Sequence, residues 1–306
     1  MSVSKTNGKF ICFNASCGAT GTLMELVKAT LKTNEFQTAR LISKAKTEHR
    51  ESFIERLQKA VEPVEFKEFN PEVIDRMEKE FWLSDVAKNY MMKHRGFDES
   101  ILREYHIGYS AKKDLLAVPM YNAKGMPIGV IGRSADPHNK VFKNSKGLPT
   151  SKSLWNIHKA KRTGDTVIVC EASFDAMRVA QAGYPNVVAC LGGNFSDHHE
   201  QQLSMYFSRI IIMTDFDDSE KHRYVNCRKC MVKNLPNCVG HNPGRALGRK
   251  IADKMKGKTV LWASYGPNQV YPEGCKDAGD MTIEQIRQCI QNAASNLEYS
   301  SWGIAD

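Results

Sequence analysis

The C-terminal half of the chain alternates short apolar runs with longer segments in which apolar residues recur every three or four positions. Such runs are typical of strands buried on both faces, and the segments between them are typical of covering helices. The pattern predicts strands at 166–170, 187–190, 209–214 and 259–263. It predicts helices at 174–182, 197–207, 245–256 and 283–294. This alternation predicts an α/β fold, a parallel sheet with helices on both faces.

The preceding hundred residues follow a different pattern. Asn70-Pro71 has the form of a helix cap followed by proline at the first helical position. Helices are predicted at 71–81, at 84–95 with Gly96 as the stop, and from the cap Asp98 to Gly108. Strands are predicted at 115–121 and 127–132, joined by a turn at 122–125. The order predicts a separate α+β subdomain.

The N-terminal residues predict a small third region. A short strand is expected at 9–13, helices at 23–30 and 35–46, and a charged helix from there to about residue 61. Two prolines and the lack of any period predict a linker at 62–71. The predicted domains are therefore 1–62, 70–162 and 163–296.

Composition narrows the class of partner. The 306 residues include 43 Lys and Arg against 34 Asp and Glu, a formal charge of +9. This balance suits a polyanion such as nucleic acid, although it also serves solubility alone. Met1–Lys9 lacks the apolar stretch of a signal peptide, no run is long enough to span a membrane, and the nine cysteines lack secretory spacing. We therefore expect a reducing, cytoplasmic compartment and no membrane partner.

Acidic residues follow two of the predicted strands. Glu171 comes directly after the first strand, and Asp215 and Asp217 follow the third. Because the carboxyl ends of parallel strands meet at one edge, these acids are expected to lie close together. Carboxylate oxygens without nearby His or Cys suit Mg²⁺, which would neutralise their repulsion and support phosphoryl transfer. Each acid taken singly could instead be a helix cap or a solvated loop residue.

The segments that carry these acids resemble the TOPRIM domain of topoisomerases, bacterial-type primases and some nucleases. The matching segments are 171–175, 182–183, 191–193 and 215–217. The resemblance implies a TOPRIM-type, Rossmann-like sheet and a metal site made by Glu171, Asp215 and Asp217. It also implies that Asp175 is a further acid of the first motif and that Asp218 assists the metal. Ala172 stands where the family usually has glycine, which changes the turn and removes no ligand.

Upstream motifs resemble those of bacterial-type, DnaG-like primases in their order. They are a Leu-rich helix and Gly-Tyr turn at 102–109, Gly132-Arg133, the Lys-x-aromatic-Lys-Asn-Ser run at 140–145, and an aromatic segment at 153–157. In that family this α+β subdomain holds the template, which implies nucleic-acid binding by Arg133, Lys140, Lys143 and Asn144. Eight Lys or Arg lie between residues 132 and 164, although a solvated hairpin face is the alternative. Phe142 and Trp155 either stack on bases or belong to the core.

Clustered cysteines predict zinc. Cys227-x2-Cys230 and Cys238-x2-His241 have the paired spacing of a tetrahedral structural site, within an insertion at 219–243. The alternative is a loop with free thiols. The insertion either contacts nucleic acid or has a structural role only.

Two further segments resemble parts of primases. Cys12 and Cys17 resemble the second half of a primase zinc ribbon, but four residues separate them where the family has two, and no Cys or His precedes them. The ribbon is therefore partial, and it is either degenerate or completed by another chain. Residues 276–281 resemble an acidic turn late in the primase core, so Asp277 either approaches the metals or caps the following segment.

The resemblance implies a DNA primase, a nucleotidyltransferase that makes short RNA primers on single-stranded DNA with Mg²⁺ or Mn²⁺. The expected partners are the DNA template, ribonucleoside triphosphates and a replicative helicase of the primosome, since the chain contains no Gly-x4-Gly-Lys-Ser/Thr phosphate loop. The small size and the partial ribbon suggest a phage origin, and then the host cytoplasm. Two alternatives stay open, a TOPRIM-family nuclease and a non-catalytic, zinc-stabilised nucleic-acid-binding protein.

Overall fold

The computed structural model describes residues 2–3, 9–11, 19–47, 66–136, 141–217 and 241–302. By its internal contacts the chain divides into two compact units. The first contains Met1–Glu65, and the second contains Phe66–Gln202 and Tyr206–Asp306. Within the described ranges, no helix is both long and apolar enough to cross a membrane.

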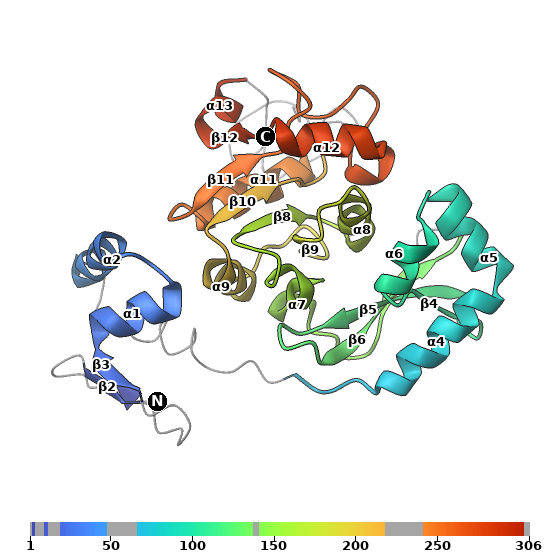
Figure 1. Cartoon of the computed structure of the whole chain (residues 1–306), viewed down its shortest axis with the longest axis horizontal. Coiled ribbons are helices and arrows are strands. Elements are labelled where there is room, and N and C mark those ends of the chain that lie inside the picture. Colours follow the sequence, from blue (N-terminus) through green and yellow to red (C-terminus); the bar gives the residue numbers. More distant parts are fainter. Residues whose placement is uncertain are drawn as a thin grey trace, which may run out of the picture. The chain divides into compact units, whose positions relative to one another are not determined.

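The smaller unit has an antiparallel sheet and two helices (Figure 1). Its elements are β1 (Ser2–Val3), β2 (Lys9–Ile11), β3 (Thr20–Thr22), α1 (Leu23–Leu31) and α2 (Glu35–Thr47). Thr22 starts α1 with a capping box, because its hydroxyl accepts from the Glu25 amide and Glu25 Oε2 accepts from the Thr22 amide. The two helices confirm the predicted ones. Cys12, Cys17 and the charged helix predicted up to residue 61 lie outside the described residues.

The larger unit begins with helices packed on an antiparallel sheet of order β4-β5-β6-β7. Asn70 caps the first helix through its side chain, which accepts from the Glu72 amide at 2.9 Å, as the Asn-Pro pair predicts. The helices are α4 (Pro71–Leu83), α5 (Asp85–Lys88), the π-helix η1 (Asn89–His94) and α6 (Glu99–Glu104). The strands are β4 (Gly108–Ser110), β5 (Leu115–Tyr121), β6 (Pro127–Ser134) and β7 (Phe142–Asn144).

Two helix predictions in this layer were wrong in detail. The segment predicted as one helix at 84–95 is α5 followed by η1, and the helix predicted to reach Gly108 ends at Glu104. The chain reverses there because His106 takes a positive φ of 51°. Gly108 instead begins a strand so close to α4 that a Cβ on it would lie 2.7 Å from Met77 Cβ. The close packing of β4 on α4 decides where α6 ends and β4 begins. The local sequence pattern does not contain this information.

The second layer is a five-stranded sheet of order β12-β11-β10-β8-β9 (Figure 1). Its strands are β8 (Thr166–Cys170), β9 (Val187–Ala189), β10 (Arg209–Ile212), β11 (Thr259–Trp262) and β12 (Ala294–Ser295). The helices around it are α7 (Ile157–Ala160), α8 (Ser173–Gln181), α9 (Asp197–Tyr206), α11 (Pro243–Lys254), α12 (Ile283–Gln291) and α13 (Asn296–Ser301). Four strands are parallel, and only the edge strand β12 runs antiparallel.

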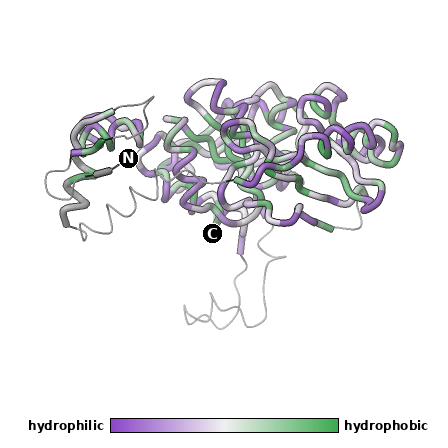
Figure 2. Tube along the Cα trace, turned by 90° about the horizontal axis from the view of Figure 1, so that it is seen from below, coloured by the Kyte–Doolittle hydropathy of each residue, from purple (hydrophilic) through white to green (hydrophobic). Residues whose placement is uncertain are grey.

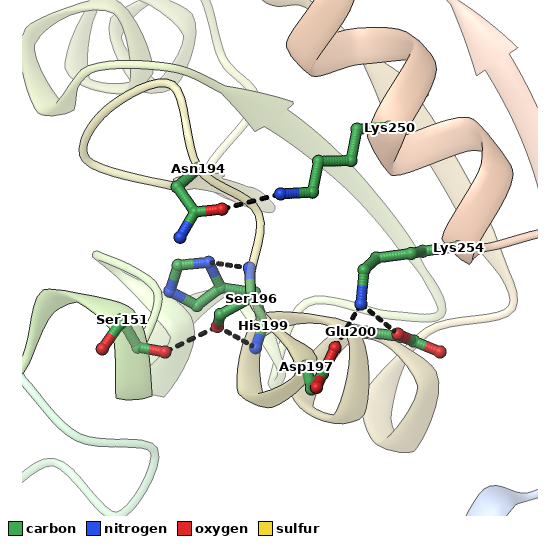
Figure 3. A network of polar contacts seen from close by, with 8 residues as sticks. All are labelled: Ser151, Asn194, Ser196, Asp197, His199, Glu200, Lys250 and Lys254. Atoms are coloured by element: carbon green, nitrogen blue, oxygen red, sulfur yellow. Dashed lines mark hydrogen bonds and ion pairs between the residues drawn. The ribbon is translucent and has the colours of Figure 1, made fainter.

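Helices cover both faces of this sheet, which confirms the predicted fold class. On one face α9 and α11 are joined by Lys254, whose ammonium group binds Asp197 and Glu200 (Figure 3). On the other face α8 packs against α12. Hydrophobic, green stretches run through the middle of the larger unit, whereas hydrophilic, purple stretches are frequent along its periphery (Figure 2). The apolar runs therefore became strands because only a sheet covered on both faces buries them completely.

Helix α8 and the segment before α7 link the two layers of the larger unit. Arg178 on α8 donates to the carbonyls of Gly96 and Met281, each at 2.8 Å. Trp155 is 2% exposed, donates from its indole nitrogen to the Pro119 carbonyl at 3.1 Å, and pairs through its backbone with Ala189. Trp155 is thus a core residue, which is one of the two roles considered for it.

His158 on α7 predicts a pH-dependent stability. Its ring packs on Tyr121 with centroids 4.8 Å apart, and burial, followed by the charge of Lys159, lowers its pKa to about 4. Because the unfolded chain binds this proton near pH 6.5, the neutral ring stabilises the fold fully above that value. The free energy of unfolding should therefore fall as the pH drops from 6.5 towards 4. Denaturant titrations at several pH values should show a smaller fall for His158→Phe, and equal falls would contradict this assignment.

Candidate active site

The carboxyl edge of the parallel sheet brings three acidic side chains to one place. Glu171 follows β8, and Asp215 and Asp217 lie in the loop that follows β10. These strands are neighbours in parallel register, with Val169 opposite Ile212. The topology therefore places the three acids as the order of strands predicts, while their role as metal ligands stays a prediction.

The acids at this edge destabilise one another's charged forms. The pKa of Asp215 is raised to about 8, first by burial and then by the charges of Asp175, Glu171 and Asp277. The pKa of Glu171 is raised by burial and then by Asp217. Such mutual perturbation is typical of a functional site rather than of solvated surface carboxylates. We call Glu171, Asp175, Asp215, Asp217 and Asp277 the acid cluster.

Asp175 and Asp277 enter the cluster from other elements. Asp175 lies in the first turn of α8 and is 8% exposed, and its pKa is raised to about 7, first by burial and then by Asp277. Asp277 also caps the 3-10 helix η4 (Ala278–Asp280), accepting from the Asp280 amide at 3.2 Å. A Cβ on Gly279 would lie 3.0 Å from Asp277 Oδ1 and 3.2 Å from Asp175 Oδ1. Asp277 therefore combines both roles considered for it, a cap and a neighbour of the acids.

Three cations moderate this charge. Lys276 forms an ion pair with Asp277 at 3.2 Å and opposes the rise in the pKa of Asp215. Arg133 and Arg95 oppose the rise in the pKa of Asp175. Sequence reasoning gave no role to Arg95 or Lys276. Arg95 follows the π-helix η1, about eighty residues before Asp175, and no local pattern connects the two.

The loop that carries Asp215 and Asp217 is held by backbone contacts on both sides. The Phe216 amide donates to the Lys276 carbonyl at 2.6 Å, and the Tyr271 hydroxyl donates to the Thr214 carbonyl at 2.7 Å. The amide of Gly244 donates to Asp217 Oδ2 at 2.9 Å, at the N-terminus of α11. The first turn of α11 therefore orients the Asp217 carboxylate.

Asn242 ties the start of α11 to the same loop. Its Oδ1 accepts from the amides of Arg245, at 3.0 Å, and Asp217, at 3.2 Å. Its Nδ2 donates to the Asp217 carbonyl at 2.9 Å, and the residue is 3% exposed. One side chain thus caps the helix and fixes the backbone of an acidic residue 25 positions earlier.

The loop after β9 supports Glu171. Leu191 adopts a positive φ of 63° and donates from its amide to the Glu171 carbonyl at 2.9 Å. Further along, Lys250 donates to Asn194 Oδ1 at 2.7 Å (Figure 3). His199 Nδ1 accepts from the Ser196 amide, so its Nε2–H donates to the Thr150 carbonyl at 2.8 Å. His199 is buried and structural.

The basic residues predicted to bind nucleic acid lie on and beside the edge strand β7. Phe142, Lys143 and Asn144 are all exposed, and the Phe142 side chain is 61% exposed. Arg133 on β6 is half-buried, with its guanidinium 5.2 Å from the Phe142 ring centroid and 4.8 Å from that of Phe174. Since Phe174 precedes Asp175 on α8, Arg133 connects the exposed strand to the acid cluster.

Several predicted site residues lie outside the described residues. They are Lys140, Asp218, Cys227, Cys230 and Cys238. His241, the fourth predicted zinc ligand, lies just before Asn242 and is half-buried.

The donor chemistry of the acid cluster fits a divalent cation, because every ligand it offers is a carboxylate oxygen. The pKa values of Glu171, Asp175 and Asp215 are all raised, first by burial and then by neighbouring acids, which shows that these groups are close together. Among the described residues, no three Asp, Glu, His or Cys side chains are arranged closely enough to hold a metal as they stand.

Comparison with known proteins identifies the class of this domain. Residues 165–219 match the Toprim domain family, and this range contains Glu171, Asp215 and Asp217. A DNA primase from Clostridium acetobutylicum is 28% identical over 138 residues, which cover 41% of this chain and 23% of that protein. The match therefore spans about a quarter of the relative's length.

Solved structures resemble the fold over a longer range. The zinc-binding and RNA polymerase domains of the Aquifex aeolicus primase align with a TM-score of 0.57 at 19% identity, covering 97% of this chain and 76% of that one. A DnaG primase catalytic domain bound to single-stranded DNA aligns with a TM-score of 0.55 at 14% identity, covering 76% of this chain and 79% of that one. Residues 165–219 therefore match a Toprim domain, within a fold that resembles those of DnaG primase domains.

Gly244 should be indispensable to this arrangement. A Cβ on Gly244 would lie 2.1 Å from the Asp215 carbonyl oxygen, so Gly244→Ala must displace α11 from the acidic loop. We expect a loss of about 1–3 kcal/mol in the free energy of unfolding. Gly257→Ala is the matched control, because nothing lies within 4 Å of its Cβ. Denaturant unfolding of both variants tests this, and equal stability of the two would contradict the close contact.

Proposed function

We propose that the protein is a DNA primase that synthesises short RNA primers on single-stranded DNA from ribonucleoside triphosphates. The single observation that carries this is the acid cluster at the carboxyl edge of a Toprim sheet, linked through Arg133 to an exposed basic strand. Nucleotidyl transfer needs acidic residues that hold a divalent metal ion, because the ion neutralises the negative phosphates of the nucleotide. It also needs cationic side chains nearby to hold the template strand.

In this proposal Glu171, Asp215 and Asp217 hold Mg²⁺ or Mn²⁺, and Asp175 and Asp277 support them. The bound ion supplies neutralisation of the nucleotide phosphates and activation of the primer hydroxyl. The protein's own part is positional. Asn242 and the Gly244 amide fix Asp217, while the Lys276 carbonyl fixes the backbone between the two aspartates. The site is thereby held on rigid elements rather than on a free loop.

Template binding is proposed for the face formed by Arg133, Lys143 and Asn144, with Lys140 extending it. Lys143 supplies charge to phosphates, and the exposed Phe142 ring supplies a surface on which a base can stack. Contacts of this kind hold the backbone of a strand without selecting a sequence. The face therefore suits an enzyme that copies many templates.

The remaining parts of the proposal concern metals and partners. Cys227, Cys230, Cys238 and His241 are proposed to bind structural zinc, and Cys12 and Cys17 to form a partial ribbon. A separate replicative helicase is proposed as the partner, with the cytoplasm, or the host cytoplasm for a phage protein, as the compartment. A nuclease would use the same acids, but it would not require the exposed strand β7 beside them.

Neutralising the acid cluster should abolish synthesis without unfolding the protein. Asp215→Asn removes a carboxylate that is buried among like charges, so we expect primer synthesis to fall more than about a hundredfold while thermal stability is kept or raised. Asp253→Asn, an exposed acid on α11, is the control and should retain activity. The measurement is incorporation of labelled ribonucleotides on single-stranded DNA with Mg²⁺. Degradation of the DNA without synthesis would favour the nuclease instead.

Lys143 should contribute a sequence-independent phosphate contact. Lys143→Ala is expected to weaken single-stranded DNA binding equally for different sequences and to reduce the slope of log K against log salt by about 0.7. Lys256→Ala, an exposed lysine at the end of α11, serves as the control and should leave the slope unchanged. Fluorescence anisotropy at several salt concentrations measures both, and an unchanged slope for Lys143→Ala would exclude the contact.

A further inference from the structure

A recess lies at the junction of the two layers of the larger unit and shares no residue with the acid cluster. It has a volume of about 140 Å³. The residues around it come from the end of α6, the end of β5 and the start of α7. The lining side chains that matter are Tyr105, Tyr121, Trp155, Asn156, His158 and Lys159.

Aromatic rings form the walls of this recess in two pairs. The rings of Tyr105 and Trp155 have centroids 5.0 Å apart, and those of Tyr121 and His158 have centroids 4.8 Å apart. Trp155 is anchored by its bond to the Pro119 carbonyl, so these walls are rigid. Flat, rigid aromatic surfaces favour a planar ring as the occupant.

Buried polar atoms in the recess lack hydrogen-bond partners. They are Tyr105 Oη, Asn156 Oδ1 and His158 Nδ1, in residues of which Tyr105 is 5% and Asn156 1% exposed. Leaving such an atom unsatisfied costs about 1–3 kcal/mol. Three in one recess therefore indicate an occupant with both donors and acceptors along its edge.

The orientation of these groups is set by the fold. Asn156 takes a left-handed φ of 64°, and its Nδ2 donates to the Val187 carbonyl at 2.8 Å, which fixes the direction of Oδ1. Burial raises the pKa of Tyr105, and a side-chain contact with Asn156 opposes this rise, although no hydrogen bond of normal geometry joins Tyr105 Oη to Asn156, so the two groups lie close together. A hydroxyl and an amide oxygen that lie close together can share one edge of a heterocycle.

Charges of both signs border the recess, with more cations than acids: the Glu104 carboxylate pairs with Lys159 at 3.4 Å, and Glu78 pairs with His106 at 2.8 Å. The charges of Lys159, Arg162, Lys161 and His106 all lower the pKa of His158, after the larger effect of burial. The Lys159 ammonium lies 4.4 Å from the Tyr105 ring centroid and donates to the Glu104 carbonyl at 2.6 Å. Arg162 is exposed. An anionic group attached to a planar ring would therefore be attracted here.

We propose that this recess binds the base of a nucleotide, with its edge on Tyr105, Asn156 and His158 and its phosphate towards the cations of residues 159–162. A cavity of about 150 Å³ accepts one benzene ring, so the recess suits a six-membered pyrimidine ring. The base can come from a free nucleotide or from a single strand of DNA. This site goes beyond the proposed function, because it is separate from the acid cluster and needs no catalysis.

Calorimetric titration of the full chain with uridine 5′-monophosphate in EDTA tests the proposal without the metal site. We expect a Kd below about 1 mM, and much weaker binding of ribose 5-phosphate, which has no base. Tyr105→Phe keeps its ring and removes only the hydroxyl, and His158→Phe replaces the imidazole by another aromatic ring without polar atoms, so each should weaken binding about fivefold. Tyr184→Phe, a tyrosine outside the recess, and Asp215→Asn should bind as the wild type does.

The same variants distinguish the source of the base. If Tyr105→Phe also weakens binding of a short deoxythymidine oligonucleotide, the recess takes a base of single-stranded DNA. If it weakens only the monophosphate, the ligand is a free nucleotide. Absence of binding to both probes, equal binding of ribose 5-phosphate, or unchanged affinity in both ring variants would each overturn the proposal. Because the test is binding in EDTA, its failure leaves the assignment of primer synthesis untouched.

Discussion

Repulsion between carboxylates at the carboxyl edge of the parallel sheet is the constraint on which the rest of the structure depends. Burial alone would raise the pKa of Asp175 and Asp215, and their mutual charge raises it further. A folded chain tolerates this only when cations lie close by. The protein supplies them from three separate segments, as Lys276, Arg95 and Arg133.

These cations explain why the antiparallel layer and the Toprim sheet must be joined firmly. Arg95 and Arg133 belong to the first layer, whereas the acids belong to the second. Helix α8 holds the two layers together, because Arg178 on this helix donates to the carbonyl of Gly96, the residue after Arg95. The same helix carries Asp175. Helix α8 therefore both carries an acid that the cations neutralise and joins the two layers that supply the acids and the cations.

Glycine has a comparable role on the opposite side of the acidic loop. Gly244 allows the first turn of α11 to approach the Asp215 carbonyl. Gly248 allows the next turn to pack on Trp262, because a Cβ at this position would lie only 2.6 Å from the Trp262 ring. The helix N-terminus can then donate directly to Asp217. A helix that stood even one methyl group further away would lose this bond, so the acidic site and the packing of α11 are inseparable.

Periodicity and residue spacing alone predict the parallel sheet, the order of its helices and the three acids at strand ends. Burial on both faces demands apolar runs such as 166–170, and the carboxyl ends of parallel strands must share an edge. The short polar strand β7 and the edge strand β12 carry no such period, so local pattern could not reveal them. Only the tertiary structure decided that Arg95 balances Asp175, that Trp155 is core, and that Tyr105, Asn156 and His158 meet around one recess. Those relations depend on packing between segments 30 to 80 residues apart in the chain, a distance over which composition and periodicity carry no information.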